Sequence, residues 1–182
     1  MRFAMILIVY AHPYPQHSRA CRVLLDGVRD LPDIEVRSLY DLYPDFDIDV
    51  SAEQGALARA ARIVWLHPIY WYSTPALLKH WFEVVLLRGW AYGKDGDALR
   101  NKDCLWVTTT GGDENAYSPA GMHEQPFESF VAPIEQTARF CGMRWQPPLV
   151  VHGAHIVSED RLRAMAQDFR DRLVAARAEP SI

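Results

Sequence analysis

Short apolar runs alternate with longer segments of helical periodicity along the chain, and this alternation restricts the fold more than any other feature. The runs include Ile6 to Tyr10, Ile63 to Leu66, Cys104 to Val107 and a stretch near Leu149 to Val151. Short buried runs separated by amphipathic helices are typical of successive βαβ units with right-handed crossovers. The sequence therefore predicts an α/β fold with five parallel strands and five helices.

Start and stop signals place the first two helices. Ser18 can cap the first helix, which a proline ends shortly before a second strand at Ile34 to Arg37. Ser51 and Gln54 have the spacing of a capping box, which predicts that a short alanine-rich helix begins there and continues to about Ala61.

Two further helices follow from the same signals. Thr74 and Pro75 predict a helix start with proline at the first helical position. The apolar face of this helix is wide enough to indicate burial on two sides, either entirely within the chain or partly against a second subunit. A last helix is expected from Ser158 to about Ala175.

Composition excludes several functional classes. With 182 residues and 49% hydrophobic content, residues 1–182 are predicted to form one well-buried domain. The net charge of −4 gives no reason to expect nucleic-acid binding. Cys21, Cys104 and Cys141 are odd in number and lack a C-x-x-C pattern, so a reducing cytoplasm is expected. His152 and His155 have no carboxylate nearby in sequence, so no metal site is predicted.

Three of the apolar runs end in unusual loops. The first is followed by residues 11–18, the second by the aromatic residues 67–74, and the third by three threonines and two glycines, Thr108 to Gly112. In a doubly wound sheet of order 2-1-3-4-5, the ends of strands one, three and four meet where the strand order reverses. We therefore expect the three loops to form one crevice.

The first loop has a polar character that suits a phosphate group. Ser18 and the backbone N–H groups at the start of the first helix could bind a phosphate, with His12 and the Arg19 and Cys21 amides beside it. The same residues could instead form an ordinary proline-stiffened turn with a capping serine.

The other two loops suit a planar ring. Ile69 to Tyr72 could hold the ring edge by backbone hydrogen bonds, or could be core or interface aromatics. Gly111 and Gly112 could admit the ring face, or could belong to a plain turn that needs one left-handed glycine. Phosphate, ring edge and ring face together favour a flavin nucleotide over any explanation that uses a single loop.

Residues 111–126 form the longest irregular stretch and carry two titratable groups of interest. Tyr117 and His123 could stabilise negative charge on a carbonyl oxygen and deliver a proton to it, or could be solvated loop residues. Trp71 and Trp106 are interpreted as packing residues.

The chain resembles the NAD(P)H:quinone oxidoreductase family of flavodoxin-like flavoproteins over nearly its whole length. The resemblance lies in Ala11 to Pro13, Pro68 to Tyr72 leading into Pro75 to Lys79, Trp90 to Tyr92, and Thr109 to Gly112. It implies a flavodoxin-like fold of order 2-1-3-4-5. The residues implied for the phosphate end are His12, Ser18, Arg19, Ala20 and Cys21. Those implied for the isoalloxazine are Ile69, Tyr70, Trp71, Tyr72, Thr109, Thr110, Gly111 and Gly112.

Two segments are similar to different branches of that family. Residues 37–49 and 89–93 resemble the ancillary proteins of bacterial glutathione-regulated potassium-efflux systems. This branch implies FMN, with FAD as the alternative, a homodimer, and a place on the cytoplasmic face of the transporter. Residues 113–131 depart from the branch, and there Tyr117 and His123 are similar to the pair that assists hydride transfer in animal quinone reductases.

The sequence thus predicts a ping-pong oxidoreductase in which NAD(P)H and then a quinone occupy the same site. No G-x-G-x-x-G pattern is present, which fits a nicotinamide held by the flavin face instead of by its own domain. Two other classes stay open: a flavin-binding regulatory subunit whose catalysis is incidental, and a one-electron carrier of the flavodoxin type.

Overall fold

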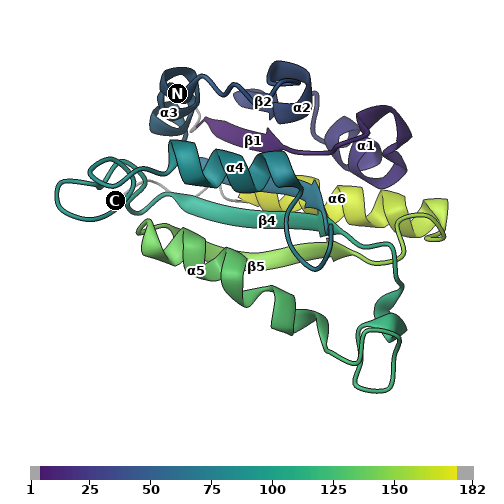
Figure 1. The fold of residues 1–182 in the computed structure, drawn as a ribbon. Coiled ribbons are helices and arrows are strands. Elements are labelled where there is room, and N and C mark those ends of the chain that lie inside the picture. Colours follow the sequence, from purple (N-terminus) through teal and green to yellow (C-terminus); the bar gives the residue numbers. More distant parts are fainter. Residues whose placement is uncertain (1–4, 176–182) are drawn as a thin grey trace.

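A computed structural model describes residues 5–175, in which five strands form one parallel sheet (Figure 1). The order is β2-β1-β3-β4-β5, as predicted. The strands are β1 (Ile6–Tyr10), β2 (Ile34–Ser38), β3 (Arg62–Pro68), β4 (Asp103–Thr109) and β5 (Arg144–Val151). The chain order reverses between β1 and β3, so the carboxyl ends of these strands border a crevice.

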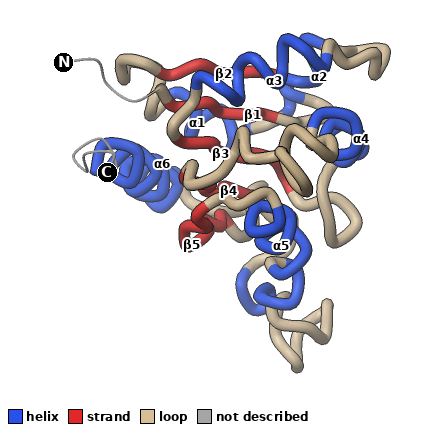
Figure 2. Tube along the Cα trace, turned by 90° about the vertical axis from the view of Figure 1, so that its left-hand side faces the viewer, coloured by secondary structure: helices blue, strands red, loops and turns tan. Residues whose placement is uncertain are grey.

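Helices cover both faces of the sheet. The α-helices are α1 (Arg19–Asp26), α2 (Leu39–Leu42), α3 (Val50–Arg59), α4 (Ala76–Val85), α5 (Ala132–Phe140) and α6 (Glu159–Ala175). Three short 3₁₀ helices add η1 (Pro15–His17), η2 (Glu114–Ala116) and η3 (Phe127–Phe130). Figure 2 shows α6 on one side of the sheet and α4 and α5 on the other.

The central strands β1, β3 and β4 are mostly apolar because both faces of the sheet are buried there, whereas the edge strands β2 and β5 carry charged and polar residues. Alternate residues point to opposite faces, so Leu7 and Val9 join the core beneath α3, α4 and α5, whereas Ile8 joins the core beneath α1 and α6. No helix among residues 5–175 is long and apolar enough to cross a membrane.

The start of α3 differs from the prediction. The capping residue is Asp49, whose side chain accepts a hydrogen bond from the Ala52 amide at 2.9 Å. The predicted capping box of Ser51 and Gln54 is therefore wrong. Asp49 combines a short acceptor with a negative charge at the helix start, and Gln54 instead donates to the Val85 carbonyl at 2.9 Å.

Other boundaries also shift. Helix α4 begins at Ala76 with Pro75 at the capping position, so proline is not its first helical residue, and the buried Thr74 hydroxyl has no hydrogen-bond partner. Ser18 precedes α1 as predicted, but its side chain makes no capping hydrogen bond. The described residues contain six α-helices instead of five, because the one-turn α2 follows β2.

The wide apolar face of α4 is accounted for within one chain. Leu77, Leu78, Trp81 and Val85 are all fully buried in the core. Of the two alternatives left open by the sequence, the internal helix explains this face without a second subunit.

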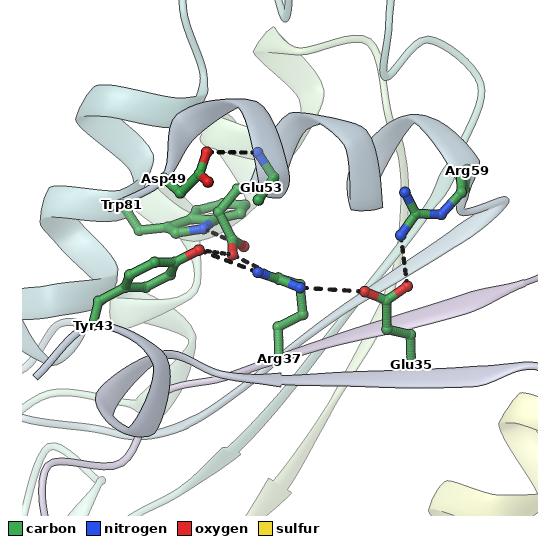
Figure 3. Close-up of polar contacts among 8 residues, drawn as sticks. Glu35, Arg37, Tyr43, Asp49, Glu53, Arg59 and Trp81 are labelled. Carbon is green, nitrogen blue, oxygen red and sulfur yellow. Dashed lines mark hydrogen bonds and ion pairs between the residues drawn. The ribbon is translucent and has the colours of Figure 1, made fainter. Parts of the chain in front are cut away.

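A buried carboxylate joins α3 and α4 to β2 (Figure 3). Glu53 has no exposed surface and accepts hydrogen bonds from Arg37 Nε at 2.5 Å, the Tyr43 hydroxyl at 2.6 Å and Trp81 Nε1 at 2.9 Å. Burial raises the pKa of Tyr43, and its hydrogen bond to Glu53 raises it further. The phenol therefore stays protonated and acts as a donor. This cluster fixes α4, which begins directly after the aromatic loop.

Candidate functional site

The three loops predicted to meet do border one cavity at the carboxyl edge of the sheet. Its volume is about 350 Å³, within the range of small-molecule sites. Nine of the residues predicted to bind a cofactor line it, namely His12, Ser18, Arg19, Ala20, Ile69, Tyr70, Thr109, Thr110 and Gly111. Cys21, Trp71, Tyr72 and Gly112 do not line it.

Backbone hydrogen bonds continue past the strand ends and hold the loops against each other. The Ala11 amide donates to the Leu66 carbonyl at 3.0 Å, and the Ile69 amide donates to the Thr109 carbonyl at 2.8 Å. The Thr110 amide donates to the Val151 carbonyl at 3.0 Å. The cavity rim is thus an extension of the sheet, which positions its polar groups rigidly.

The end of the cavity nearest α1 carries cationic and donor groups. Arg19 is fixed by donation from Nη1 to the Val157 carbonyl at 2.7 Å. His12 Nδ1 accepts a hydrogen bond from the Tyr14 amide at 3.0 Å, which leaves Nε2 to carry the proton. Burial, followed by the nearby His155 and His17, lowers the pKa of His12. A neutral imidazole donor, an arginine and a helix start suit an anionic group.

Cys21 lies beneath this end and not in its wall. Its thiol is buried, with Sγ 4.0 Å from the Thr109 hydroxyl. Burial raises the pKa of Cys21, so the thiol is protonated at neutral pH. Only its backbone amide, at the first turn of α1, remains a candidate for ligand binding.

The aromatic loop is a tight hairpin with an unusual backbone. Tyr70 and Ser73 exchange two backbone hydrogen bonds, of 3.0 and 2.9 Å, and the two residues between them have left-handed φ values of 47° at Trp71 and 63° at Tyr72. Such residues store strain of about 1–3 kcal/mol each. Trp71 is 91% exposed, so its interpretation as a packing residue is wrong. Trp106 is fully buried, as predicted.

The two glycines are required for different reasons. Neither has a left-handed backbone, so the plain-turn alternative does not explain them. A Cβ on Gly112 would lie 3.0 Å from the Ala116 side chain and 3.2 Å from His123 Nε2. A Cβ on Gly111 would meet nothing within 4 Å, because it would point into open space at the cavity. Packing within the chain therefore explains Gly112, but not Gly111.

Tyr117 and His123 come together behind Gly112. Their ring centroids are 4.4 Å apart, and the Tyr72 hydroxyl lies 3.4 Å from His123 Nδ1. Tyr117 is only 9% exposed, so the solvated-loop alternative is wrong for it. Burial raises the pKa of Tyr117, whereas the Thr110 hydroxyl lowers it. His123 Nε2 is buried next to Gly112 without a hydrogen-bond partner, and neither Tyr117 nor His123 lines the cavity.

Several residues of the site were not predicted. Tyr14, His17, Pro68, Ala154 and His155 also line the cavity. Ala154 and His155 follow β5, whose end lies at the same edge of the sheet. Since β5 is next to β4, the loop after the fifth strand was the signal that could have found them. Among residues 5–175, no group of three or more histidine, cysteine or acidic residues could hold a metal ion.

A buried histidine fixes the end of β3 below the cavity. His67 accepts a hydrogen bond from Trp106 Nε1 at 2.8 Å, while its Nδ1 lies 2.9 Å from the Pro68 carbonyl. Because Nε2 accepts, the proton is on Nδ1 and is donated to that carbonyl. Burial lowers the pKa of His67 to about 4, so it is neutral at pH 7.

Comparison with known proteins agrees with this architecture. The profile of a family described as having a flavodoxin-like fold matches residues 4–173, and the chain belongs to that family. More particularly, it is 51% identical over 170 residues to the glutathione-regulated potassium-efflux system ancillary protein KefF of Enterobacter sp. (strain 638). That match covers 93% of this chain and 96% of the relative.

Two solved structures are similar over most of their length. General stress protein 14 of Treponema denticola, in complex with FMN, has a TM-score of 0.87 and 33% identity, and the match covers 94% of this chain and 98% of that one. An NADPH-quinone reductase from P. pentosaceus has a TM-score of 0.84 and 27% identity, with coverage of 92% and 96%.

Proposed function

We propose that this chain binds FMN in the cavity at the ends of β1, β3 and β4 and reduces quinones with NAD(P)H. The observation that carries the proposal is the meeting of three loops around one cavity, with open space above Gly111. The FMN complex of the Treponema denticola protein and the reductase activity named for the P. pentosaceus protein support the cofactor and the reaction.

The residues present fit FMN. The first turn of α1, with Ser18, Ala20 and the Cys21 amide, would hold the phosphate beside Arg19 and His12. Backbone groups of Ile69 to Tyr72 and Thr109 to Gly112 would hold the ring. When bound, FMN accepts two electrons from NAD(P)H and passes them to the quinone.

The reacting quinone oxygen gains negative charge and needs a proton donor. Tyr117 and His123 would stabilise this charge and supply the proton, since the buried phenol stays protonated and His123 Nε2 has no other partner. Tyr72 would hold His123 through Nδ1, while Nε2 lies next to Gly112 of the loop that would hold the ring. Trp71, exposed on its hairpin, would cover the open side of the ring.

The proposed protein partners rest on the named relatives and on one surface groove of this chain. The KefF relative is named as an ancillary protein of a potassium-efflux system, which supports association of this chain with such a transporter; the cytoplasmic face is the place that we propose for it. A groove of about 290 Å³ between α4 and α5 includes Tyr92 and Phe140, and Phe140 is 62% exposed. We propose that a homodimer forms through this groove.

Gly111 provides a sharp test of the cofactor site. Gly111→Val places its side chain in space that this chain leaves open, at a backbone position that is not left-handed. We expect unchanged thermal unfolding of the protein without cofactor, and FMN affinity at least about tenfold lower because the side chain occupies the ring position. The control is Gly55→Ala on α3, where the new Cβ would lie 3.6 Å from a flexible Arg59.

The full experiment identifies the released nucleotide by mass, titrates FMN into wild type and both variants, and measures NAD(P)H-dependent quinone reduction. Bound FAD would correct the cofactor, and equal FMN affinity in wild type and Gly111→Val would refute the site. Transporter activation by a variant that binds flavin but no longer turns over would favour the regulatory alternative.

A further inference from the structure

We infer that His152 is a positioning residue: through the Thr110 hydroxyl it acts on Tyr117 and on the glycine loop, residues 108–112. The inference rests on the proposed function, because it concerns the proton donor of that reaction. His152 directly follows β5 and does not line the cavity.

The Thr110 hydroxyl has its single proton committed. It donates to the Gly112 carbonyl at 2.7 Å and lies 3.1 Å from His152 Nδ1. A hydroxyl that donates to the carbonyl can only accept from the imidazole, so Nδ1 of His152 carries a proton. The hydroxyl is also close to the Tyr117 phenol, whose pKa is raised by burial.

The backbone holds this arrangement rigidly. The Gly153 amide donates to the Gly112 carbonyl at 2.8 Å, and the Ala154 amide donates to the Thr110 carbonyl at 2.8 Å. The His152 ring also packs against the Tyr117 ring, with centroids 5.4 Å apart, and against Phe127 at 5.2 Å. His152 therefore contacts both the loop that borders the cavity and the proposed proton donor.

Protonation of His152 would change the charge near Tyr117 without breaking the bond to Thr110. The second proton goes to Nε2, and Nδ1 remains a donor. Burial lowers the pKa of His152, the carboxylates of Glu114, Glu128 and Asp113 raise it, and Arg161 lowers it. The imidazole is thus neutral at neutral pH and becomes cationic on acidification. The added positive charge stabilises negative charge on the reacting oxygen.

The kinetic test uses His152→Asn, whose amide can donate to Thr110 but does not titrate, and His152→Ala, which can do neither. We expect wild-type kcat for quinone reduction to rise as the pH falls below about 6.5. His152→Asn should retain FMN and most of the neutral-pH kcat and lose that rise. His152→Ala should lower kcat about three- to tenfold, as expected for one hydrogen bond, with a smaller change in KM. His80→Asn on α4 is the matched control.

A second readout does not depend on activity. Nitrogen-15 NMR of the histidine rings, with His152 assigned by its absence from His152→Asn, reports which ring nitrogen carries the proton. We expect the Nδ1–H form at neutral pH, and a changed tautomer or pKa in Thr110→Val. An Nε2–H form, or the same pH inflection in wild type and His152→Asn, would overturn the inference. Wild type that binds FMN but reduces no quinone would instead refute the proposed function, and the tautomer would still decide the role of His152.

Discussion

Replacing Glu53 by alanine should destabilise the protein strongly, although Glu53 lies on α3 and not among the residues that line the cavity. The carboxylate has no exposed surface and is the acceptor for three donors, from Arg37, Tyr43 and Trp81. Its removal leaves the largely buried guanidinium of Arg37 without its closest partner, and the indole N–H of Trp81 without an acceptor. Removing one partner of a buried ion pair typically costs about 3–5 kcal/mol.

The size of the chain converts this energy into a temperature shift. For domains of roughly this length, 1 kcal/mol corresponds to about 2–4 °C in Tm, so Glu53→Ala should lower Tm by about 6–20 °C. Glu53→Gln should fall between wild type and Glu53→Ala, because one amide oxygen still accepts while the NH₂ group opposes a donor. Circular dichroism during heating and urea titration would measure both variants.

The matched control is Glu83→Ala on α4. Glu83 pairs with Lys79 at 3.0 Å, but the two side chains are 59% and 61% exposed. Such a pair contributes about 1 kcal/mol or less. Equal losses of stability in Glu53→Ala and Glu83→Ala would show that the buried network of Figure 3 does not stabilise the fold as argued.

Four further outcomes are expected. His67 has a pKa of about 4 in the folded state and about 6.5 in the unfolded state, so the unfolded state binds more protons between these two pH values. The free energy of unfolding should therefore fall by about 3 kcal/mol as the pH drops from 6.5 to 4. In urea titrations, the stability of His67→Gln should not show this dependence on pH. His123→Ala should slow quinone reduction about 10²-fold with FMN retained, and an unchanged rate would remove it from the mechanism. Trp71→Gly should raise the free energy of unfolding by about 1 kcal/mol, because glycine relieves the strain of the left-handed backbone, and should weaken ligand binding. A lower Tm than that of the wild type would contradict the expected gain in stability. Phe140→Glu should convert a dimer to a monomer in light scattering, and an unaltered dimer would place the interface elsewhere.

The ends of the strands could be predicted because they are marked by features local in sequence, whereas the strand order that brings three of these ends together is implied by the family resemblance. An apolar run followed by glycine or proline marks the end of a strand, and parallel topology brings such ends to one edge. The helix boundaries were less predictable. Asp49 and Ser51 are both good capping residues two positions apart, and only tertiary packing of Gln54 against α4 decides between them.

The missed site residues show what local patterns cannot supply. The spacing of His152 and His155 indicates at most a metal pair, because spacing says nothing about which loop lies beside which hydroxyl. Its sequence context predicts that Trp71 is a packing residue, because large aromatics are usually buried, whereas the hairpin presents it to solvent. Burial of Tyr117 depends on its contacts with Phe127 and His123, which the sequence places in an irregular stretch.

Gly111 and Gly112 are adjacent and chemically identical, yet selection would treat them differently. A mutant library screened only for folding should accept many side chains at position 111 and fewer at position 112, where a side chain would have to displace Ala116 or His123. The same library screened for cofactor retention should become restrictive at both. Comparing the two screens would separate residues maintained for the protein itself from residues maintained for its ligand.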